Sequence, residues 1–234
     1  MITRVFSKYT FKARLLPIIL CAIPFLIIQY LFIGPGFSAK LPWIDEYPLV
    51  WYSASFSAIG YLLSFINRII AKSIFEKSES FMPTTEFMLY SNGEFSPEYK
   101  EKLYKKIKSD FDFVLPDASE QLKNEVSSRK RIAEGIGFVR KKVGNGELLL
   151  QHNIEYGFLR NLAGASLVSE VIVSLLLVSK YFMGVPIIPT WVLVVLIIIY
   201  LIPLIIHMIY NKEIAALYAR TLFSEYLANT PKER

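Results

Sequence analysis

The 234-residue sequence has few of the residues on which enzyme active sites and covalent cross-links depend. Cys21 is the only cysteine, so the chain cannot form an internal disulfide, a cysteine zinc cluster or a CxxC redox motif. His152 has no cysteine or pair of carboxylates at the spacing of a metal site, and His207 lies at the end of a long apolar run. No GxSxG, Walker or HExxH motif occurs. We therefore expect no catalytic residues, no metal, no cofactor and no enzyme activity.

Charge is also missing from long parts of the chain, although 26 Lys and Arg and 20 Asp and Glu are present. A helix needs about 20 mostly apolar residues to cross a bilayer. The first apolar run is too long for a cleaved signal peptide, whose apolar region has about 7–15 residues. The sequence predicts an all-α membrane protein with four transmembrane helices, at Leu15–Ile33, Leu49–Ile66, Leu162–Met183 and Ile187–Ile209.

The distribution of Lys and Arg predicts how the chain is oriented, because cytoplasmic segments carry an excess of these residues. Four precede the first span and 15 lie between residues 71 and 161, whereas the connection 34–48 holds only Lys40. Both termini and the long insert between spans two and three are therefore predicted to be cytoplasmic. The predicted parts are 1–70 (N-terminal segment and spans one and two), 71–161 (helical cytoplasmic domain), 162–210 (spans three and four) and 211–234 (amphipathic helix).

Within the insert, capping signals predict three helices. Ser96 followed by Pro97 is a strong helix start, and apolar residues every four positions give that helix one apolar face. Asp117 or Ser119 is predicted to cap a second helix that runs to about Val143, where two glycines end it. A third helix begins near Glu147 and has no stop signal before span three, so we expect one continuous helix.

The tail after span four has a helical stripe that includes Ile214, Leu217, Leu222 and Tyr226. Such an amphipathic helix packs on the insert or on a neighbouring subunit, or it lies on the membrane surface. The sequence leaves these alternatives open.

Two basic triplets are the candidate ligand-binding feature of the insert. They are 11 residues apart, which is close to three helical turns, so both point in roughly the same direction about 16 Å apart. This spacing suits the phosphates of a nucleotide or a single-stranded oligonucleotide, with aromatic stacking from a nearby residue. Attraction to anionic lipid headgroups or to a protein partner is the alternative. The triplets are Arg129, Lys130, Arg131 and Arg140, Lys141, Lys142, and the residues that follow them are Tyr156, Arg160 and Asn161.

Polar residues also form narrow stripes along two predicted spans. Ser57 and Ser64 belong to the stripe in span two, and Glu170 and Ser174 to the stripe in span three. Small residues allow close helix packing, which accounts for the serines. A glutamate facing lipid costs several kcal/mol, so Glu170 is expected to face water or a partner. Four spans are too few to enclose a pore, so pore lining by these four residues requires several copies.

Two stretches carry a resemblance to a known group of proteins. They are Tyr9–Pro17 (YTFKARLLP) and Glu155–Gly164 (EYGFLRNLAG). Together they resemble bacterial membrane proteins of anti-phage defence operons, most closely the membrane effector of the Hailong system. The resemblance implies a homo-oligomeric ion channel, a tetramer in the bacterial inner membrane, that single-stranded DNA keeps shut. A nucleotidyltransferase encoded in the same operon would make the oligomer, and Tyr156, Arg160 and Asn161 would lie near it.

The sequence thus leaves two main hypotheses. One is a ligand-gated channel effector of antiviral defence, whose cytoplasmic basic helices bind a nucleotide or single-stranded DNA oligomer. The other is a non-conducting membrane scaffold that recruits a soluble protein through its insert. A small transporter is disfavoured, because the sequence has no inverted repeat and no matching pair of broken helices.

Overall fold

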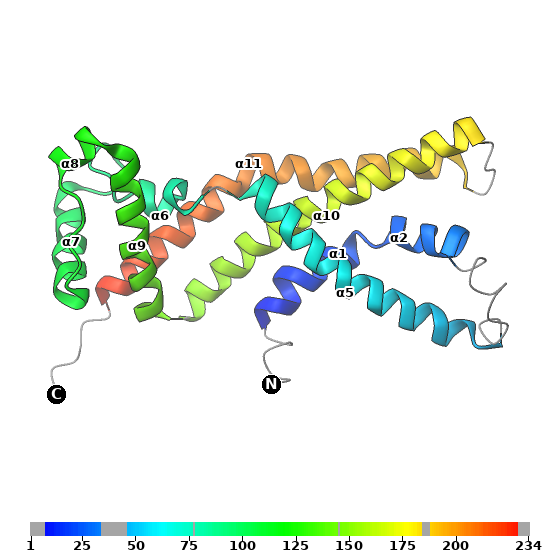
Figure 1. Cartoon of the computed structure of the whole chain (residues 1–234), viewed down its shortest axis with the longest axis horizontal. Coiled ribbons are helices and arrows are strands. Elements are labelled where there is room, and N and C mark those ends of the chain that lie inside the picture. The colour runs from blue at the N-terminus through cyan, green and yellow to red at the C-terminus, as the bar shows by residue number, and fades with distance from the viewer. Residues whose placement is uncertain (1–7, 34–45, 77, 145, 184–187, 229–234) are drawn as a thin grey trace. The chain divides into compact units, whose positions relative to one another are not determined.

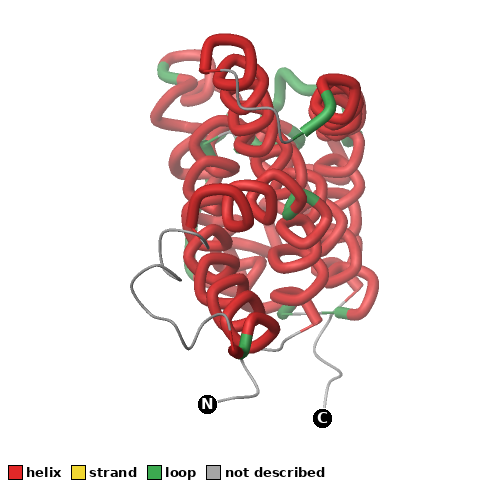
Figure 2. The backbone as a smooth tube through the Cα atoms, turned by 90° about the vertical axis from the view of Figure 1, so that its right-hand side faces the viewer, coloured by secondary structure: helices red, strands yellow, loops and turns green. Residues whose placement is uncertain are grey.

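The computed structural model describes residues 8–33, 46–76, 78–144, 146–183 and 188–228. All regular elements in these ranges are helices (Figure 2). Three helices are long and apolar enough to cross a membrane, and a bent pair of shorter helices makes a fourth candidate. The all-helical, multi-pass membrane class predicted from the sequence is therefore confirmed. The four-span topology and the cytoplasmic position of the insert stay predictions.

The chain divides into two compact units. Unit 1 comprises Met1–Glu76 and Gly157–Ile209, and unit 2 comprises Lys77–Tyr156 and Tyr210–Arg234. Unit 1 contains the apolar runs, and unit 2 contains the charged insert together with the tail. Two long helices each contribute residues to both units: α10 (Glu147–Met183) and α11 (Thr190–Ala228) (Figure 1).

In unit 1, the first apolar run is a broken helix. It consists of η2 (Thr10–Leu15), α1 (Leu16–Leu20), α2 (Ile23–Ile28) and η3 (Gln29–Ile33). Thr10–Leu20 and Ile23–Leu31 meet at an angle of 54°. Pro24 explains the break, because it has no backbone N–H to donate to the carbonyl of Leu20 four residues earlier. The Ser169 hydroxyl of α10 donates to the carbonyl of Cys21 at the break (2.9 Å).

The second run forms α5 (Pro48–Phe75), which begins with proline at its first helical position and continues beyond the predicted end at Ile66. In its most apolar stretch, none of the side chains that the structure describes is buried inside the chain. Elsewhere in unit 1, α10 and α11 pack together with the first run through a cluster that includes Cys21, Val173, Leu193 and Tyr200.

The predicted continuous helix from Glu147 through span three is confirmed, since α10 is a single helix. The fourth predicted span and the tail, which the sequence assigns to different parts of the chain, form one continuous helix, α11. No helix-stopping residue lies between Ile209 and the tail, and Pro203 does not interrupt the helix.

Unit 2 also contains η4 (Glu79–Phe81), α6 (Pro83–Glu86), α7 (Pro97–Phe111), α8 (Ala118–Lys123) and α9 (Glu125–Val143). The predicted caps are confirmed: the Ser96 hydroxyl accepts from the Tyr99 amide, and the Asp117 carboxylate accepts from the Glu120 amide. The single helix predicted from position 117 to 143 is wrong. It breaks at Asn124, whose non-helical backbone (φ −150°, ψ 84°) ends α8 and whose side chain caps α9 by accepting from the Ser127 amide.

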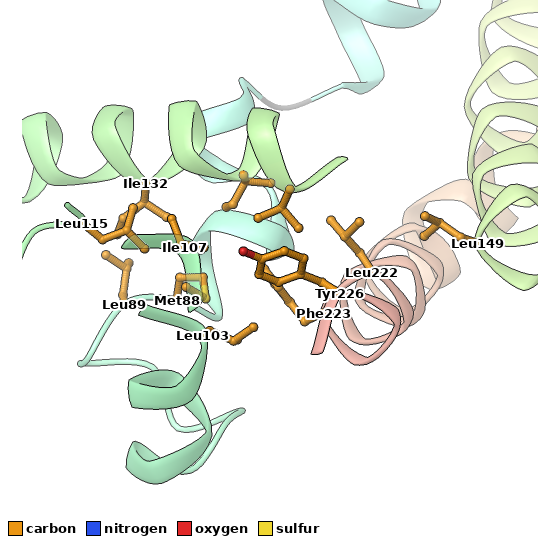
Figure 3. Close-up of a cluster of buried hydrophobic side chains, with 12 residues drawn as sticks. Met88, Leu89, Leu103, Ile107, Leu115, Ile132, Leu149, Leu222, Phe223 and Tyr226 are labelled. Atoms are coloured by element: carbon orange, nitrogen blue, oxygen red, sulfur yellow. The ribbon is translucent and has the colours of Figure 1, made fainter. Parts of the chain in front are cut away.

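The core of unit 2 lies among α7, α9 and the tail of α11 (Figure 3). Leu103 and Ile107 of α7, the predicted apolar face, are completely buried there. Leu222, Phe223 and Tyr226 of α11 are also completely buried in this cluster. The tail therefore packs on the insert, which confirms the first of its alternatives.

Candidate functional site

Both basic triplets lie on one helix, as the spacing predicts. Ile132, Ile136 and Val139 are the buried face of α9 and belong to the core of unit 2. This face of α9 points into the core. The two triplets therefore lie at the edges of the buried face and on the outer surface of the helix. Their six cations have different environments.

Arg129, Arg140 and Lys142 are engaged within unit 2. The Arg129 guanidinium forms an ion pair with Glu125 (2.7 Å), donates to the carbonyl of Ser80 (3.2 Å) and lies over the Phe81 ring. These contacts attach the segment of η4 to α9.

The other two engaged cations bind residues on both flanks of α9. The Arg140 guanidinium donates to the Glu79 carboxylate (3.3 Å) and the Thr84 hydroxyl (3.2 Å). The Lys142 ammonium pairs with Asp110 of α7 (2.7 Å). Burial alone would raise the pKa of Asp110, but hydrogen bonds from Lys142 and Tyr226 outweigh it and hold that pKa below its ordinary value.

Lys130, Arg131 and Lys141 are exposed, and none has an ion pair with a described residue. The Arg131 guanidinium lies over the Phe113 ring at 6.0 Å. These three residues are the cations of α9 that a polyanion can reach without breaking an ion pair.

A solvent-open cavity of about 240 Å³ adjoins Arg131 where α8 meets α9. Its lining is polar apart from one proline, and two of its residues are cationic. The lining residues are Pro116, Glu120, Lys123, Asn124, Ser127, Ser128 and Arg131. Lys123 and Ser127 were not among the ligand contacts predicted from the sequence, because the cavity depends on the unpredicted break at Asn124.

Tyr156, Arg160 and Asn161 all lie on α10, but they divide between the units. Tyr156 is half-buried and is the last residue of the insert in unit 2. Arg160 is 5% exposed and Asn161 is 1% exposed, both in unit 1. Their side chains bind other parts of unit 1, so their predicted role near a ligand stays a prediction.

The bonds of these two side chains form a buried polar cluster. The Arg160 guanidinium pairs with the carboxylate of Glu76 at the end of α5 (2.8 Å). The Asn161 side chain donates to the carbonyl of Ala13 (2.6 Å), and the Asn67 side chain donates to the carbonyl of Asn161 (3.0 Å). The cluster thus holds η2, α5 and α10 together.

The two stretches that carry the family resemblance meet in this cluster. A Cβ atom at Gly157 would lie 2.8 Å from the Tyr9 hydroxyl and 3.2 Å from Ala13 Cβ. A Cβ atom at Gly164 would lie 2.7 Å from the Asn67 side chain and from Ala71 Cβ. Glycine therefore allows the close approach at both positions. The seven-residue spacing of these glycines is visible in the sequence, but nothing there identifies Glu76 or Asn67 as partners.

The predicted pore-lining residues lie on two helices of unit 1. Ser57 of α5 is exposed, with its hydroxyl donating to the carbonyl of Ser53 (2.8 Å), and Ser64 is half-exposed. Glu170 and Ser174 of α10 are half-buried. The Glu170 Oε2 atom is enclosed and has no hydrogen-bond partner among the described residues. Pore lining by all four residues stays a prediction.

Among the described residues, no group of three or more His, Cys, Asp or Glu side chains could hold a metal ion. Comparison of the chain with known protein families, with curated proteins and with solved structures finds no match.

Proposed function

We propose that this chain is the subunit of a homo-oligomeric channel of antiviral defence in a bacterial inner membrane, with both termini cytoplasmic. A nucleotide or single-stranded DNA oligomer bound to the insert controls the channel. The observation that supports an anionic ligand is the exposed cationic surface of α9. Lys130, Arg131 and Lys141 form this surface, and a polar cavity lies beside it. Three cations without carboxylate partners among the described residues favour a polyanion, because no intramolecular ion pair must break when it binds.

Two features of unit 1 support an assembly of several copies. The apolar stretch of α5 is not buried by its own chain, although the helix carries Ser57 and Ser64 at helical spacing. The Glu170 carboxylate has an enclosed oxygen without a hydrogen-bond partner in the described part of the chain. Neighbouring copies around a wet axis would give Glu170 the water or partner that a carboxylate at membrane depth requires, and they could contact the unburied α5 through its serine stripe.

The continuous helix α10 supports coupling between ligand and pore. It begins in the charged insert and continues through the predicted third span. A ligand that binds the insert more tightly in one channel state shifts the population towards that state. In this mechanism, Arg160 and Asn161 act as positioning residues that fix α10 against α5 and η2.

The ligand is tested with the full chain in nanodiscs of neutral lipid and a fluorescent single-stranded DNA oligomer. Substitution of Lys130, Arg131 and Lys141 by Gln is expected to lower the affinity and to make it less dependent on salt. Loss of three contacts to single-stranded DNA reduces the slope of log K against log salt by about 2. The matched control replaces Lys102, Lys105 and Lys108, three exposed lysines of α7, by Gln. Equal effects in the two variants would contradict the assignment to α9.

Conduction is tested in liposomes that contain the purified protein, with ion flux measured with and without the oligomer. The expected result is flux that the oligomer changes and that Glu170→Lys alters. Flux that is unaffected by charge reversal at Glu170 would remove this residue from the pore. Light scattering of the detergent-solubilised protein gives the copy number, which we expect to be four.

A non-conducting scaffold is the second candidate, and one observation favours it. Leu122 is 89% exposed and Val126 is 62% exposed, four residues apart on either side of the α8–α9 break. Exposed apolar residues of this kind are typical of protein interfaces. A stable complex with a soluble partner, lost in Leu122→Ser and formed without ion flux, would favour the scaffold over the channel.

A further inference from the structure

The cavity between α8 and α9 has a lining suited to one chemical group. Lys123 supplies an ammonium, Arg131 a guanidinium and Ser127 a hydroxyl. Asn124 and Ser128 add polar groups, and Pro116 is the only apolar residue of the lining. Such a lining favours an oxygen-rich anion over an apolar or cationic ligand, because guanidinium and ammonium groups bind carboxylate and phosphate oxygens by charge-assisted hydrogen bonds.

Hydrogen bonds fix the backbone around the cavity before any ligand binds. The buried Gln121 side chain donates to the carbonyl of Pro116 (3.1 Å), and it accepts from the Tyr90 amide (2.9 Å). The Asn124 amide donates to the carbonyl of Glu120 (3.0 Å), which closes α8. The cavity therefore lies on a preorganised corner, and preorganisation lowers the cost of binding.

The positions of the cations follow from helix geometry. Ser127 and Arg131 are four residues apart on α9, so they lie on one face, one turn from each other. Arg131 also packs over the Phe113 ring, which restricts its guanidinium. Lys123 approaches from the last turn of α8. Two cations from two helices thus border one cavity.

Two carboxylates lie near these cations and limit the charge of the site. Asp117 is engaged as the cap of α8, where it accepts from the Glu120 amide (2.8 Å) and the Ser119 hydroxyl (2.7 Å). Glu120 belongs to the lining itself. The lining therefore carries two positive charges and one negative charge, which suits a small anion, and neutralising Glu120 should strengthen the binding.

We propose that this cavity is a phosphate-binding subsite, and that it takes the terminal phosphate of the ligand whose strand lies along α9. This inference rests on the proposed function for the identity of the ligand, but the affinity of the cavity for a phosphate group is measurable by itself. The volume of about 240 Å³ accommodates one phosphate group and not a whole oligonucleotide, and the cavity lies at the N-terminal end of α9, so the phosphate at the end of a strand along α9 would occupy it.

The first experiment compares two probes on the full chain in nanodiscs of neutral lipid. They are a fluorescent single-stranded DNA tetramer with a 5′-phosphate and the same tetramer without it. We expect the phosphate to raise the affinity about tenfold, as two charge-assisted contacts can. Lys123→Gln and Arg131→Gln should each reduce this difference, and Glu120→Gln should increase it. Lys105→Gln on α7 is the charge-matched control, which should leave the difference unchanged.

The second experiment measures protection against thermal unfolding by pyrophosphate, which requires no oligonucleotide. Protection that disappears in Lys123→Gln and Arg131→Gln supports the subsite even if the tetramers do not bind, in which case the proposed function fails alone. Equal binding of both tetramers, together with no effect of pyrophosphate, overturns the subsite and leaves the proposed function standing. Loss of the pyrophosphate effect in nanodiscs that contain phosphatidylglycerol assigns the cavity to a lipid headgroup, and this also overturns the proposal.

Discussion

The ion pair between Arg160 and Glu76 provides a sharp test of how unit 1 is held together. The Arg160 side chain is 7% exposed and that of Glu76 is 18% exposed, with 2.8 Å between the paired atoms. Arg160→Met keeps most of the side-chain length but removes the charge. The Glu76 carboxylate then stays at the end of α5 with Lys72 as its other basic neighbour, 3.8 Å away and on the exposed side.

The expected cost is large because removing one partner of a buried ion pair leaves an uncompensated charge. Such substitutions cost about 3–5 kcal/mol. A loss of 1 kcal/mol lowers Tm by about 2–4 °C in a protein of this size, so Tm should fall by roughly 6–20 °C. Replacing both residues, as Arg160→Met with Glu76→Leu, should recover most of the loss, since apolar pairs replace buried ion pairs at little cost.

The assay is thermal unfolding of the full chain in detergent, followed by tryptophan fluorescence, for both single variants and the double variant. Lys72→Met is the control, because it removes the exposed partner of the same carboxylate and should cost less than about 1 kcal/mol. Additive effects of the two single substitutions, with no recovery in the double variant, would refute the reasoning.

Three further predictions concern other parts of the molecule. Lys100 is 2% exposed and donates to the carbonyls of Leu89 and Asn92, so Lys100→Met should lower the free energy of unfolding by about 2–4 kcal/mol in urea titrations; an unchanged midpoint would contradict it. The pKa of Asp110 lies below its ordinary value, so the stability that this carboxylate contributes is complete above about pH 4 and is lost as the pH falls through the folded-state pKa. Tyr226→Phe removes one hydrogen bond to Asp110, which raises that pKa towards its unfolded value, so the loss of unfolding free energy below about pH 4 should shrink; an identical acid profile would count against it. Gly164→Ala should cost about 1–3 kcal/mol because the new Cβ meets Asn67 and Ala71, whereas Gly60→Ala on α5, with no atom within 4 Å, should leave unfolding unchanged or raise its midpoint.

Local signals in the sequence were sufficient for much of unit 2. The caps at Ser96 and Asp117 and the apolar face with Leu103 and Ile107 depend on residues only a few positions apart, so the chain pattern contains them. The break at Asn124 was missed because the residues before and after it continue a helical pattern. Asn is a helix cap only when the backbone turns, and this turn depends on packing between α8 and α9.

In the predicted membrane spans, too, the features set by nearby residues were predictable and those set by tertiary contacts were not. Apolar length predicted α5 and the long runs in α10 and α11. Pro24 accounts for the bend in the first run, but the Ser169 hydroxyl that binds the Cys21 carbonyl there lies 148 residues away, and no local pattern reports that contact. The continuity of α11 was missed because the change from apolar to amphipathic composition resembles a boundary, although no stop residue marks one.

The candidate site was predictable only as a set of charges. The two triplets identified α9, but the sequence could not separate Arg129, Arg140 and Lys142, which bind their own chain, from the three exposed cations. For Arg140 and Lys142 that distinction depends on Glu79 and Asp110, whose positions are set by tertiary packing, whereas Arg129 pairs with Glu125 four residues earlier on the same helix. Arg160 and Asn161 were predicted from the resemblance to lie near a ligand, and the structure shows their bonds to Glu76 and Ala13.

Gly157 and Gly164 fix the number of residues that can lie between them on α10. Each glycine admits a different neighbour, Tyr9 and Ala13 at the first position and Asn67 and Ala71 at the second. Adding or deleting one residue between them would rotate one glycine by about 100° relative to the other around the helix axis. A bulky side chain would then face one of the two neighbours. This interval of the chain therefore tolerates neither insertion nor deletion, whatever substitutions its outward-facing positions accept.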